Sequence, residues 1–460
     1  MEYTNSTRID SASFAGLIGL ARKDITPSIG IYSRNWGASK TDIATGVHRP
    51  LTLTCMTVQE HTSALPLVLI AADLGWWRSA ADERALRGAI LEAFHLPESR
   101  LMFCLSHTHA GPVLFTEDRS RPGGDRIAPY LEQLKDDAIA AISEALAQAV
   151  PSTLAWHYGQ CGLATNRDLP SEHENRVLVG FNPAIPADDT LLVGRITDED
   201  EKITGILVNY ACHPTTLAWD NPLLSPDYVG AMRTLVEEQT DATCLFFQGA
   251  SGELAPAEQY VGDVAIADAH GYQLGHAVLA TLAGMRKPGS VLVRGHVVES
   301  GAPLAIWQSV PKTPSATLRA EMLTVNMLLK ELPSLQEIES QWHDSTDRVR
   351  KERLWRLRGI RKTVGAGSSS PMPLWIWRLG DACLVGQPNE AYSWFQQQVR
   401  QALAPTPVAV MNIVNGYAGY LPPHNRYHED IYAVWSTPFA SGALEQLAET
   451  TINALKKAMQ

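Results

Sequence analysis

Apolar and polar positions follow two distinct patterns along this chain, and the two patterns succeed one another repeatedly. Short apolar runs bounded by turn residues predict β-strands, and longer segments with apolar positions three or four apart predict helices. Strands are predicted over residues 15–21, 51–58, 67–72, 101–105, 191–196, 203–210, 244–247, 374–378, 383–386 and 408–414. Helices are predicted over residues 83–95, 127–149, 228–238, 264–284 and 442–459. This succession indicates an α/β fold with mixed sheets and flanking helices.

A helix-prone segment of a different character covers residues 315–362, with one interruption near Pro333. It is rich in basic side chains, namely Arg348, Arg350, Lys351, Arg353, Arg356 and Arg358. Such a segment indicates either an anionic partner or a solvated helical arm, and we favour the arm because no nucleic-acid motif accompanies the charge. No low-complexity linker and no repeat divides the chain. We therefore expect one large domain over residues 1–460, with a helical insertion at 315–362.

Composition and charge narrow the class of protein. The 460 residues are 45% apolar and 19% charged, which is ordinary for a globular protein with a large core. The net charge of -11 argues against nucleic acid or an anionic membrane surface as a partner. The six cysteines stand in apolar contexts without a CxxC pair, so they predict buried thiols in a reducing compartment.

The chain also shows no sign of a targeting or membrane-spanning segment. Residues 1–6 lack the basic and apolar regions of a signal peptide, and no apolar run approaches the roughly 20 residues of a membrane span. We therefore expect a cytoplasmic protein without stable membrane insertion. The sequence does not predict the oligomeric state.

The pair His107 and His109 is the strongest chemical signal in the chain. The two histidines follow the apolar run at 101–105 and precede the Gly111-Pro112 break. In a continuing strand, residues two apart point to the same side, so both rings would face one place. Imidazole is the commonest metal ligand and exchanges protons near neutral pH. Taken alone, the motif indicates a metal or proton-transfer site no more strongly than a polar strand end.

Further sites with candidate chemistry lie at the ends of other predicted elements, and each has an ordinary structural interpretation. They are His213 before Pro214, Asp227 at a helix start, Ser251 in a Gly-Ala-Ser-Gly turn, Glu390 at a predicted helix start, and Tyr417 and Tyr420 after an Asn-Gly turn. A carboxylate at a helix start is favoured by capping and by the helix dipole, so Asp227 and Glu390 need no functional role on that ground. Spacing does not connect these positions, but their order along the chain is informative.

Seven short elements of the chain, in order, resemble the catalytic domain of the neutral (non-lysosomal) ceramidase family. The clearest is Ser106-His107-Thr108-His109-Ala110-Gly111-Pro112, which is similar to the family's Thr-His-Thr-His-Ser-Gly-Pro. The remaining elements are the Asp-Ile-Thr strand at 19–26, the Asn-Arg element at 166–170, the segments 213–216 and 225–227, the element 252–257, the Pro-x-Glu at 388–390 and the Asn-x-Tyr-x-x-Tyr at 415–420. The resemblance implies a neutral-ceramidase-like catalytic domain.

The resemblance also implies a zinc (Zn2+) site and roles for individual residues. The implied zinc ligands are His107, His213, Glu390 and Tyr420, the last chosen over Tyr417 as the better match to the family's tyrosine. Zinc lowers the pKa of a bound water and polarises a carbonyl group. By the same resemblance, His109 moves a proton, and Arg167 and Tyr427 hold the substrate or the developing oxyanion.

The sequence departs from the family pattern in ways that affect these expectations. Ala255 replaces the family's serine and Glu253 its aspartate, which favours attack by zinc-bound water over any role for a serine hydroxyl. The interval from Tyr420 to Tyr427 is shorter than in the family. The signal peptide and C-terminal β-sandwich domain of secreted ceramidases are not expected in this sequence. Long-chain ceramide is therefore no better a substrate expectation than another amide or an ester.

Three functional hypotheses follow. The first is a zinc-dependent amidohydrolase acting on a linear amide, with a small-molecule amide or ester as substrate; an esterase or amidase on a non-lipid substrate is its close alternative. The second is a serine hydrolase that uses Ser251. The third is a non-catalytic binding protein on the same scaffold. The sequence leaves open whether Glu253 and Asp227 take part in catalysis.

Overall fold

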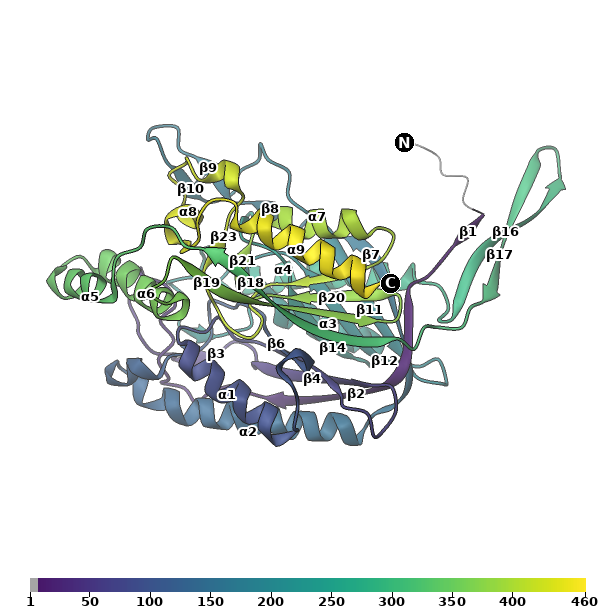
Figure 1. The fold of residues 1–460 in the computed structure, drawn as a ribbon, viewed down its shortest axis with the longest axis horizontal. Helices are drawn as coiled ribbons and strands as arrows, with labels where there is room; N and C mark the ends of the chain where they lie inside the picture. Colours follow the sequence, from purple (N-terminus) through teal and green to yellow (C-terminus); the bar gives the residue numbers. More distant parts are fainter. Residues whose placement is uncertain (1–6) are drawn as a thin grey trace.

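Two β-sheets lie face to face at the centre of the molecule, and helices cover the outer face of each sheet (Figure 1). The computed structural model describes residues 7–460. Residues 1–6, on which the expectation about a signal peptide rests, lie outside the described residues. The predicted α/β class with mixed sheets and flanking helices is confirmed.

The larger sheet has eight strands in the order β14-β12-β11-β7-β2-β4-β5-β6. Their bounds are β2 Ser13–Asp24, β4 Thr52–Gln59, β5 Leu67–Ala72, β6 Leu101–Leu105, β7 Val150–Gln160, β11 Thr190–Thr197, β12 Ile203–Tyr210 and β14 Thr243–Gln248. The pairs β5·β6 and β12·β14 are parallel and the other pairs are antiparallel. The strands β5, β6 and β14 are buried on both faces along almost their whole length, which explains why they appear in the sequence as continuous apolar runs. The central strands β2 and β7 are partly exposed.

The smaller sheet has the order β18-β19-β20-β22 and packs against the larger one. Its strands are β18 Leu318–Leu328, β19 Ser369–Leu379, β20 Ala382–Gly386 and β22 Val408–Met411. Trp375 and Trp377 of β19 are almost completely buried and fill the space between the sheets together with Met102, Leu245 and Met411. The contact between the two sheets is therefore a packed apolar layer.

Helices complete the outer layers. On the large sheet, α1 Ala80–Ala93 and α2 Ile127–Ala147 cover one half, and α3 Tyr228–Thr240 and α4 Val264–Ala283 cover the other. On the small sheet, α7 Ser393–Leu403 and α9 Ala443–Ala458 bury their apolar faces. Among residues 7–460, none of the helices combines the length and the apolar character that a membrane span requires.

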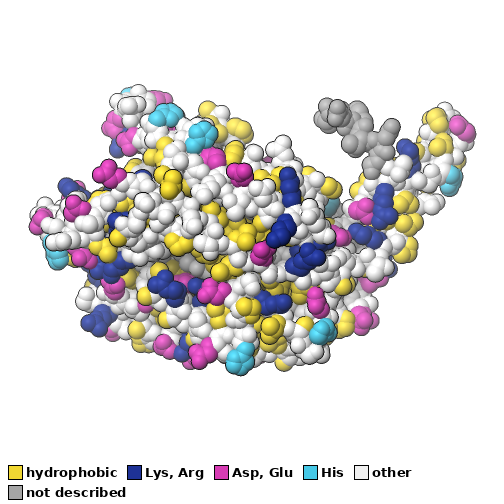
Figure 2. Space-filling view, in the orientation of Figure 1, with side chains coloured by type: hydrophobic (Ala, Val, Ile, Leu, Met, Phe, Trp, Pro, Cys, Tyr) yellow, Lys and Arg dark blue, Asp and Glu magenta, His cyan; other side chains and the backbone are white. Residues whose placement is uncertain are grey.

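Several short elements carry the loops at the edges of the two sheets. They are β1 Arg8–Ile9, β3 Gly46–Val47, β8 Ala164–Asn166, β9 Asp168–Pro170, β10 Val177–Val179, β13 Leu223–Leu224, β15 Leu254–Pro256, β21 Glu390–Ala391, β23 Tyr420–Leu421 and α8 Tyr432–Ser436. The hairpin of β16 Ser290–Glu299 and β17 Pro303–Pro311 projects from the body and is largely exposed (Figures 1 and 2).

The segment at 315–362 differs from its prediction in one respect. Its first part is not helical, because Leu318–Leu328 forms β18 and pairs with β19 along its whole length. Pairing with a neighbouring strand overrides the local helix preference there. The second part contains two helices, α5 Leu335–Asp344 and α6 Arg348–Val364. All six cysteines are free and buried, as their sequence contexts predict.

A buried ion pair joins the large sheet to its covering helices. The Arg233 side chain on α3 donates to both carboxylate oxygens of Asp73, at 2.6 and 3.2 Å. Asp73 follows β5 directly and also accepts from the backbone N–H and hydroxyl of Thr52. The loop that begins at Asp73 reaches Gly75 and then Trp76, both of which contribute to the site described below.

This ion pair gives a test of the fold. Removing one partner of a buried pair leaves an uncompensated charge and costs about 3–5 kcal/mol. We expect Arg233→Met to lower the melting temperature by about 3–5 °C for a chain of this length, as followed by circular dichroism. The control is Lys202→Met, which breaks the exposed pair with Asp241 and should have little effect. Equal effects of the two substitutions would contradict the assignment.

Candidate metal centre

His107 and His109 lie in the loop that follows β6, and the loop conformation places them together. The strand ends at Leu105, and His107 has φ of 69°, so the strand does not continue through the motif. The expected alternation of a strand therefore does not apply here. The two ring centroids still lie 4.9 Å apart, because the His107 amide bonds to the Leu74 carbonyl and turns the loop.

Backbone carbonyl groups set the orientation of the two buried imidazoles of His107 and His213. His107 Nδ1 lies 3.2 Å from the Gly75 carbonyl oxygen, and His213 Nδ1 lies 2.6 Å from that of Ser251. A carbonyl oxygen only accepts hydrogen bonds, so each Nδ1 carries the hydrogen. Each Nε2 is then the atom with a free lone pair. Burial and, secondarily, the Arg167 charge lower the pKa of His213 to about 4, so this ring is neutral at pH 7.

Glu390 and Tyr420 face this pair of rings from the other side of the cluster. They stand opposite each other in the parallel pair of β21 and β23, so one backbone register places both side chains. Glu390 Oε2 lies 2.8 Å from His213 Nε2 and 3.3 Å from His107 Nε2. The Tyr420 hydroxyl lies 3.4 Å from the same His213 nitrogen. Glu390 was predicted to begin a helix, but it lies in β21, two residues before Tyr392, the N-cap of α7.

The central atoms of this cluster are lone-pair donors that face one another. Two Nε2 atoms and one carboxylate oxygen converge, and the side chains of His107, His213 and Glu390 are at most 4% exposed. Acceptors held this close, away from water, need a shared proton or a cation between them. The nitrogen and oxygen donors are those that suit a zinc-like ion.

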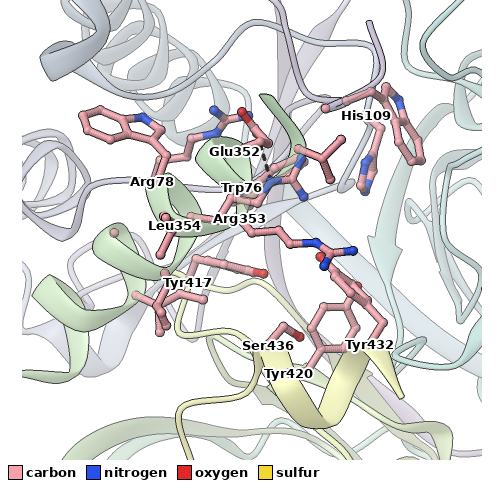
Figure 3. Close-up of a pocket in the computed structure, with 18 of the residues that line it drawn as sticks. Trp76, Arg78, His109, Glu352, Arg353, Leu354, Tyr417, Tyr420, Tyr432 and Ser436 are labelled. Carbon is pink, nitrogen blue, oxygen red and sulfur yellow. Dashed lines mark hydrogen bonds and ion pairs between the residues drawn. The ribbon is translucent and has the colours of Figure 1, made fainter. Parts of the chain in front are cut away.

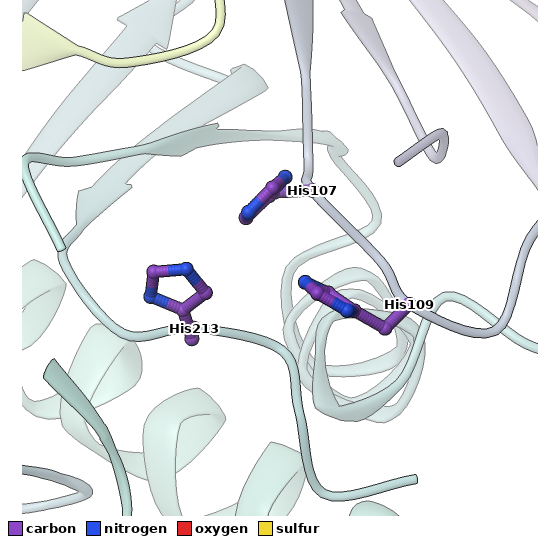
Figure 4. A group of neighbouring side chains, drawn as sticks. All are labelled: His107, His109 and His213. Atoms are coloured by element: carbon purple, nitrogen blue, oxygen red, sulfur yellow. The ribbon is translucent and has the colours of Figure 1, made fainter. Parts of the chain in front are cut away.

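His109 completes a group of three histidines, one ring nitrogen of each lying within 4.8 Å of the others (Figure 4). Both ring nitrogens of His109 are buried without a hydrogen-bond partner among the described residues. The His109 ring lies between the indoles of Trp36 and Trp76, with its centroid 4.9 Å from the ring centroid of each. Burial, followed by the neighbouring His107 and His213, lowers the pKa of His109 well below its usual range.

Arg167 brings a fixed positive charge to the edge of the cluster. Its Nη2 lies 3.0 Å from the Tyr420 hydroxyl and 3.2 Å from His213 Nε2, and it donates to the Gly252 carbonyl at 2.8 Å. Arg167 is placed by its position between β8 and β9, where its amide bonds to the Glu253 carbonyl. Tyr417 donates to the second oxygen of Glu390 at 2.7 Å and so orients that carboxylate.

A pocket of about 600 Å³ opens onto the cluster (Figure 3). Aromatic residues and residues of α6 together form most of its lining, and His109 and Arg167 also border it. The aromatic residues are Trp36, Trp76, Trp77, Phe115, Trp219, Tyr260, Trp355, Tyr417, Tyr420, Tyr432 and Trp435. Sequence reasoning described the α6 region as a solvated arm, whereas one face of this helix forms a wall of the pocket. The basic residues of this helix favoured a solvated arm, although the apolar Leu354, Trp355 and Ile360 between them indicate a buried face.

The structure does not bring Tyr427 to the cluster. Its hydroxyl donates to the carbonyl groups of Phe439 and Ala440, at 3.3 and 3.2 Å, and the residue does not line the pocket. The short interval after Tyr420 leaves Tyr427 at the end of a tight turn at 424–426. The expectation that Tyr427 holds the substrate therefore has no geometric support.

Ser251 and Asp227 have structural partners. The Ser251 hydroxyl is buried and accepts a hydrogen bond from the Gln248 amide, while His213 contacts only the Ser251 backbone carbonyl. Among the described residues the hydroxyl therefore has no histidine base beside it. Asp227 caps α3 by accepting from Tyr228 N–H and also accepts from Leu217 N–H. This is the capping role that its sequence position predicts.

The fold and the cluster together define a class: a mixed α/β protein with a buried, nitrogen- and oxygen-lined candidate metal centre beneath an aromatic pocket. No protein-family model matches the chain, and a comparison with curated proteins gives no match. Among solved structures, the chain is similar to a ceramidase complexed with C2, with a TM-score of 0.67 and 18% identity over 98% of this chain and 76% of that one.

A second similar structure is the neutral ceramidase from Pseudomonas aeruginosa. Its TM-score is 0.65 at 18% identity, over 98% of this chain and 75% of that one. The chain therefore has the neutral ceramidase fold along almost its whole length. The resemblance stated from the seven sequence elements is confirmed at the level of the fold.

Glu253 lies behind the cluster and is buried with a single partner residue. Its carboxylate accepts from the Ser393 amide, at 2.9 and 3.0 Å, and from the Ser393 hydroxyl at 2.5 Å. Burial outweighs these bonds and raises the pKa of Glu253 to about 7. The carboxyl group therefore holds the Ser393 end of α7 against the loop that follows β14.

This raised pKa predicts a pH dependence of stability. Below about pH 4.5 the Glu253 carboxyl group is protonated in both the folded and the unfolded protein. As the pH rises toward 7, the carboxyl group ionises only in the unfolded protein, so the stability of the fold falls. Above pH 7 the stability no longer changes on account of this group. The loss is roughly 3 kcal/mol at most. Between pH 5 and 8 we expect the melting temperature of the native chain to fall by roughly 2–3 °C relative to Glu253→Gln. A constant difference between the two proteins across this range would refute the assignment.

Proposed function

We propose that this protein is a zinc-dependent hydrolase that cleaves a linear amide bond in a small-molecule substrate. The observation that carries the proposal is the convergence of His107 Nε2, His213 Nε2 and Glu390 Oε2 on one buried place. The similar solved structures are described as ceramidases, which supports an amide as the substrate. An ester is the second candidate bond, because the same machinery suits both acyl groups.

His107, His213, Glu390 and Tyr420 would hold the zinc. His107 Nε2 has no hydrogen-bond partner among the described residues, and the Tyr420 hydroxyl lies beside His213. Both groups fit a tetrahedral set of nitrogen and oxygen ligands. The hydrogen bonds from His107 and His213 to backbone carbonyls fix the rings in the tautomer that a metal requires. When bound, zinc would supply a water of lowered pKa and polarise the scissile carbonyl.

The surrounding residues have separable tasks. His109 is neutral and has no hydrogen-bond partner among residues 7–460, so it would accept a proton and return it to the leaving amine. Arg167 would place its guanidinium N–H beside the oxygen that becomes negative. Tyr417 would keep the Glu390 carboxylate in its orientation through the 2.7 Å hydrogen bond. The aromatic pocket would exclude water and accept the apolar part of the substrate.

Metal analysis tests the ligand set. We expect about one zinc per chain in protein purified without added metal, and removal by a chelator should abolish hydrolysis. His107→Ala and Glu390→Gln should each lower the affinity for zinc by about 10- to 100-fold or more. The zinc that remains bound to each variant is measured by plasma emission spectrometry. The exposed His173→Ala is the matched control and should retain zinc. Full activity of metal-free protein would overturn the proposal.

A second measurement tests whether His109 is a proton carrier or a zinc ligand. The question arises because one ring nitrogen of His109 lies within 4.8 Å of a nitrogen of His107 and of His213. As a proton carrier, His109 should be dispensable for zinc binding. We expect His109→Gln to keep its zinc and to lose about 10²- to 10⁴-fold in kcat. Loss of zinc in this variant would instead make His109 a ligand.

A further inference from the structure

The wall of the pocket formed by α6 carries positive charge that the described carboxylates beside it neutralise only in part. On the outward sides of this helix, Arg358 pairs with Glu117 and Glu339, and Lys362 pairs with Glu117. On the pocket side, the guanidinium groups of Arg350 and Arg353 have neither an ion pair nor a hydrogen bond to any residue in the range 7–460. The contrast between the two sides of one helix indicates that the pocket side has a different partner.

Arg353 lines the pocket and is exposed to solvent at its open side. Figure 3 shows its side chain extending from α6 toward the segment that carries Tyr432. Its guanidinium carbon lies 4.7 Å from the ring centre of Trp435. The ring centroids of Trp435 and Tyr432 lie 4.7 Å apart, and those of Tyr432 and Tyr420 of the cluster lie 5.3 Å apart. A continuous aromatic surface therefore connects the candidate metal centre to Arg353.

Arg356 lies one turn further along the same face and closer to the cluster. Its guanidinium lies over the Trp76 ring at 5.6 Å, the same ring that contacts His109 at 4.9 Å. Glu352 accepts from Arg356 Nε at 3.0 Å, and the Asn35 carbonyl accepts from Nη2 at 2.6 Å. These contacts leave Nη1 without a hydrogen-bond partner among the described residues.

The acidic groups near the pocket balance only part of this charge. The pKa of the exposed Asp347 at the start of α6 is lowered by the N–H groups of Arg350 and Val349 and further by the charges of Arg353 and Arg350, but its carboxylate forms no ion pair with either guanidinium. Glu352 is the one carboxylate among the lining residues, and Arg356 already binds it. Arg78 also lines the pocket, but its charge acts on Glu352 and on Asp118 behind it. Arg350, Arg353 and the free edge of Arg356 therefore give the pocket a surplus of positive charge next to an aromatic surface.

We infer that the pocket selects amides that carry a compact anionic group, a carboxylate or a phosphate, and that Arg353 and Arg356 recognise this group. The inference rests on the proposed function and names its substrate class. Guanidinium groups bind such anions through paired, charge-assisted hydrogen bonds. The aromatic walls would hold the apolar acyl part of the same molecule.

Three amides with one acyl group test the inference. N-Hexanoylethanolamine is neutral, N-hexanoylglycine carries a carboxylate, and N-hexanoylphosphoethanolamine carries a phosphate. We expect kcat/KM of the zinc-loaded enzyme to be higher by about tenfold or more for at least one anionic amide than for the neutral one. The anionic amide with the higher kcat/KM shows whether the pocket recognises a carboxylate or a phosphate. Equal or better turnover of the neutral amide would overturn the inference and leave the proposed hydrolase intact. Hydrolysis of none of these amides, or of a wider set of amides and esters, would count against the proposed function instead.

Variants of α6 assign the effect to residues. Arg353→Gln should lower kcat/KM for the preferred anionic amide by about 10- to 100-fold, mainly through KM, and leave the neutral amide within about twofold. Arg353→Lys keeps the charge and should restore part of the loss. Arg361→Gln is the matched control, since among the described residues the Arg361 side chain bonds to the carbonyl of Gly365, the C-cap of α6, and does not line the pocket. Equal losses for the anionic and neutral amides would refute the role of Arg353.

A binding measurement keeps the inference testable without turnover. Metal-free protein is titrated with N-hexanoylglycine, N-hexanoylphosphoethanolamine and N-hexanoylethanolamine, and quenching of the pocket tryptophans reports binding. We expect at least one anionic amide to bind more tightly than the neutral amide, and Arg353→Gln to remove the difference. Equal affinities in the native protein would contradict the inference, whatever the enzyme assays show.

Discussion

The structure is organised around one electrostatic constraint: a buried carboxylate oxygen and two imidazole lone pairs point at the same place. Glu390 Oε2 lies within 3.3 Å of both Nε2 atoms, and neither ring can rotate away without losing its hydrogen bond to a backbone carbonyl. Without a cation or a proton between them, these groups would repel one another where water cannot screen them. The surrounding fold must therefore supply enough rigidity to hold an arrangement that is unfavourable on its own.

The two packed sheets supply that rigidity. The histidines follow β6 and β12 of the large sheet, whereas Glu390 and Tyr420 lie in β21 and β23, which follow strands of the small sheet. The loops from the two sheets are bonded to each other: the Leu105 amide donates to the Ile413 carbonyl, and the Asn412 amide donates to the Gln248 carbonyl. The cluster is thus assembled across the interface between the sheets, and the apolar layer around Trp375 and Trp377 fixes the distance between its halves.

The sequence predicted most strands of the two sheets and most helices because their apolar patterns are set by burial on one or two faces. Strands 101–105 and 203–210 match β6 and β12 at both ends. The strands β7 and β18 were missed because their partly exposed residues alternate weakly, and their pairing with neighbouring strands is not visible locally. The proposed ligand set came from family order, since residues 177 positions apart, such as His213 and Glu390, have no local signature of contact. The pocket wall escaped prediction for a related reason: the arginines of α6 look solvated until the opposite wall is known.

The candidate metal centre and the wall of the pocket share one physical feature, namely polar groups without a protein partner among the described residues. In the candidate centre, His107 Nε2 and both nitrogens of His109 are buried without a hydrogen-bond partner in this part of the chain. On α6, Arg353 forms no ion pair with a described residue on the pocket side, whereas Arg358 and Lys362 are paired where they face away. A buried polar atom without a partner is costly to the free protein, whereas the exposed guanidinium of Arg353 is hydrated and stays available to an anion. Since His109 and Arg353 line the same pocket, a single molecule bound between the candidate metal centre and α6 would contact both.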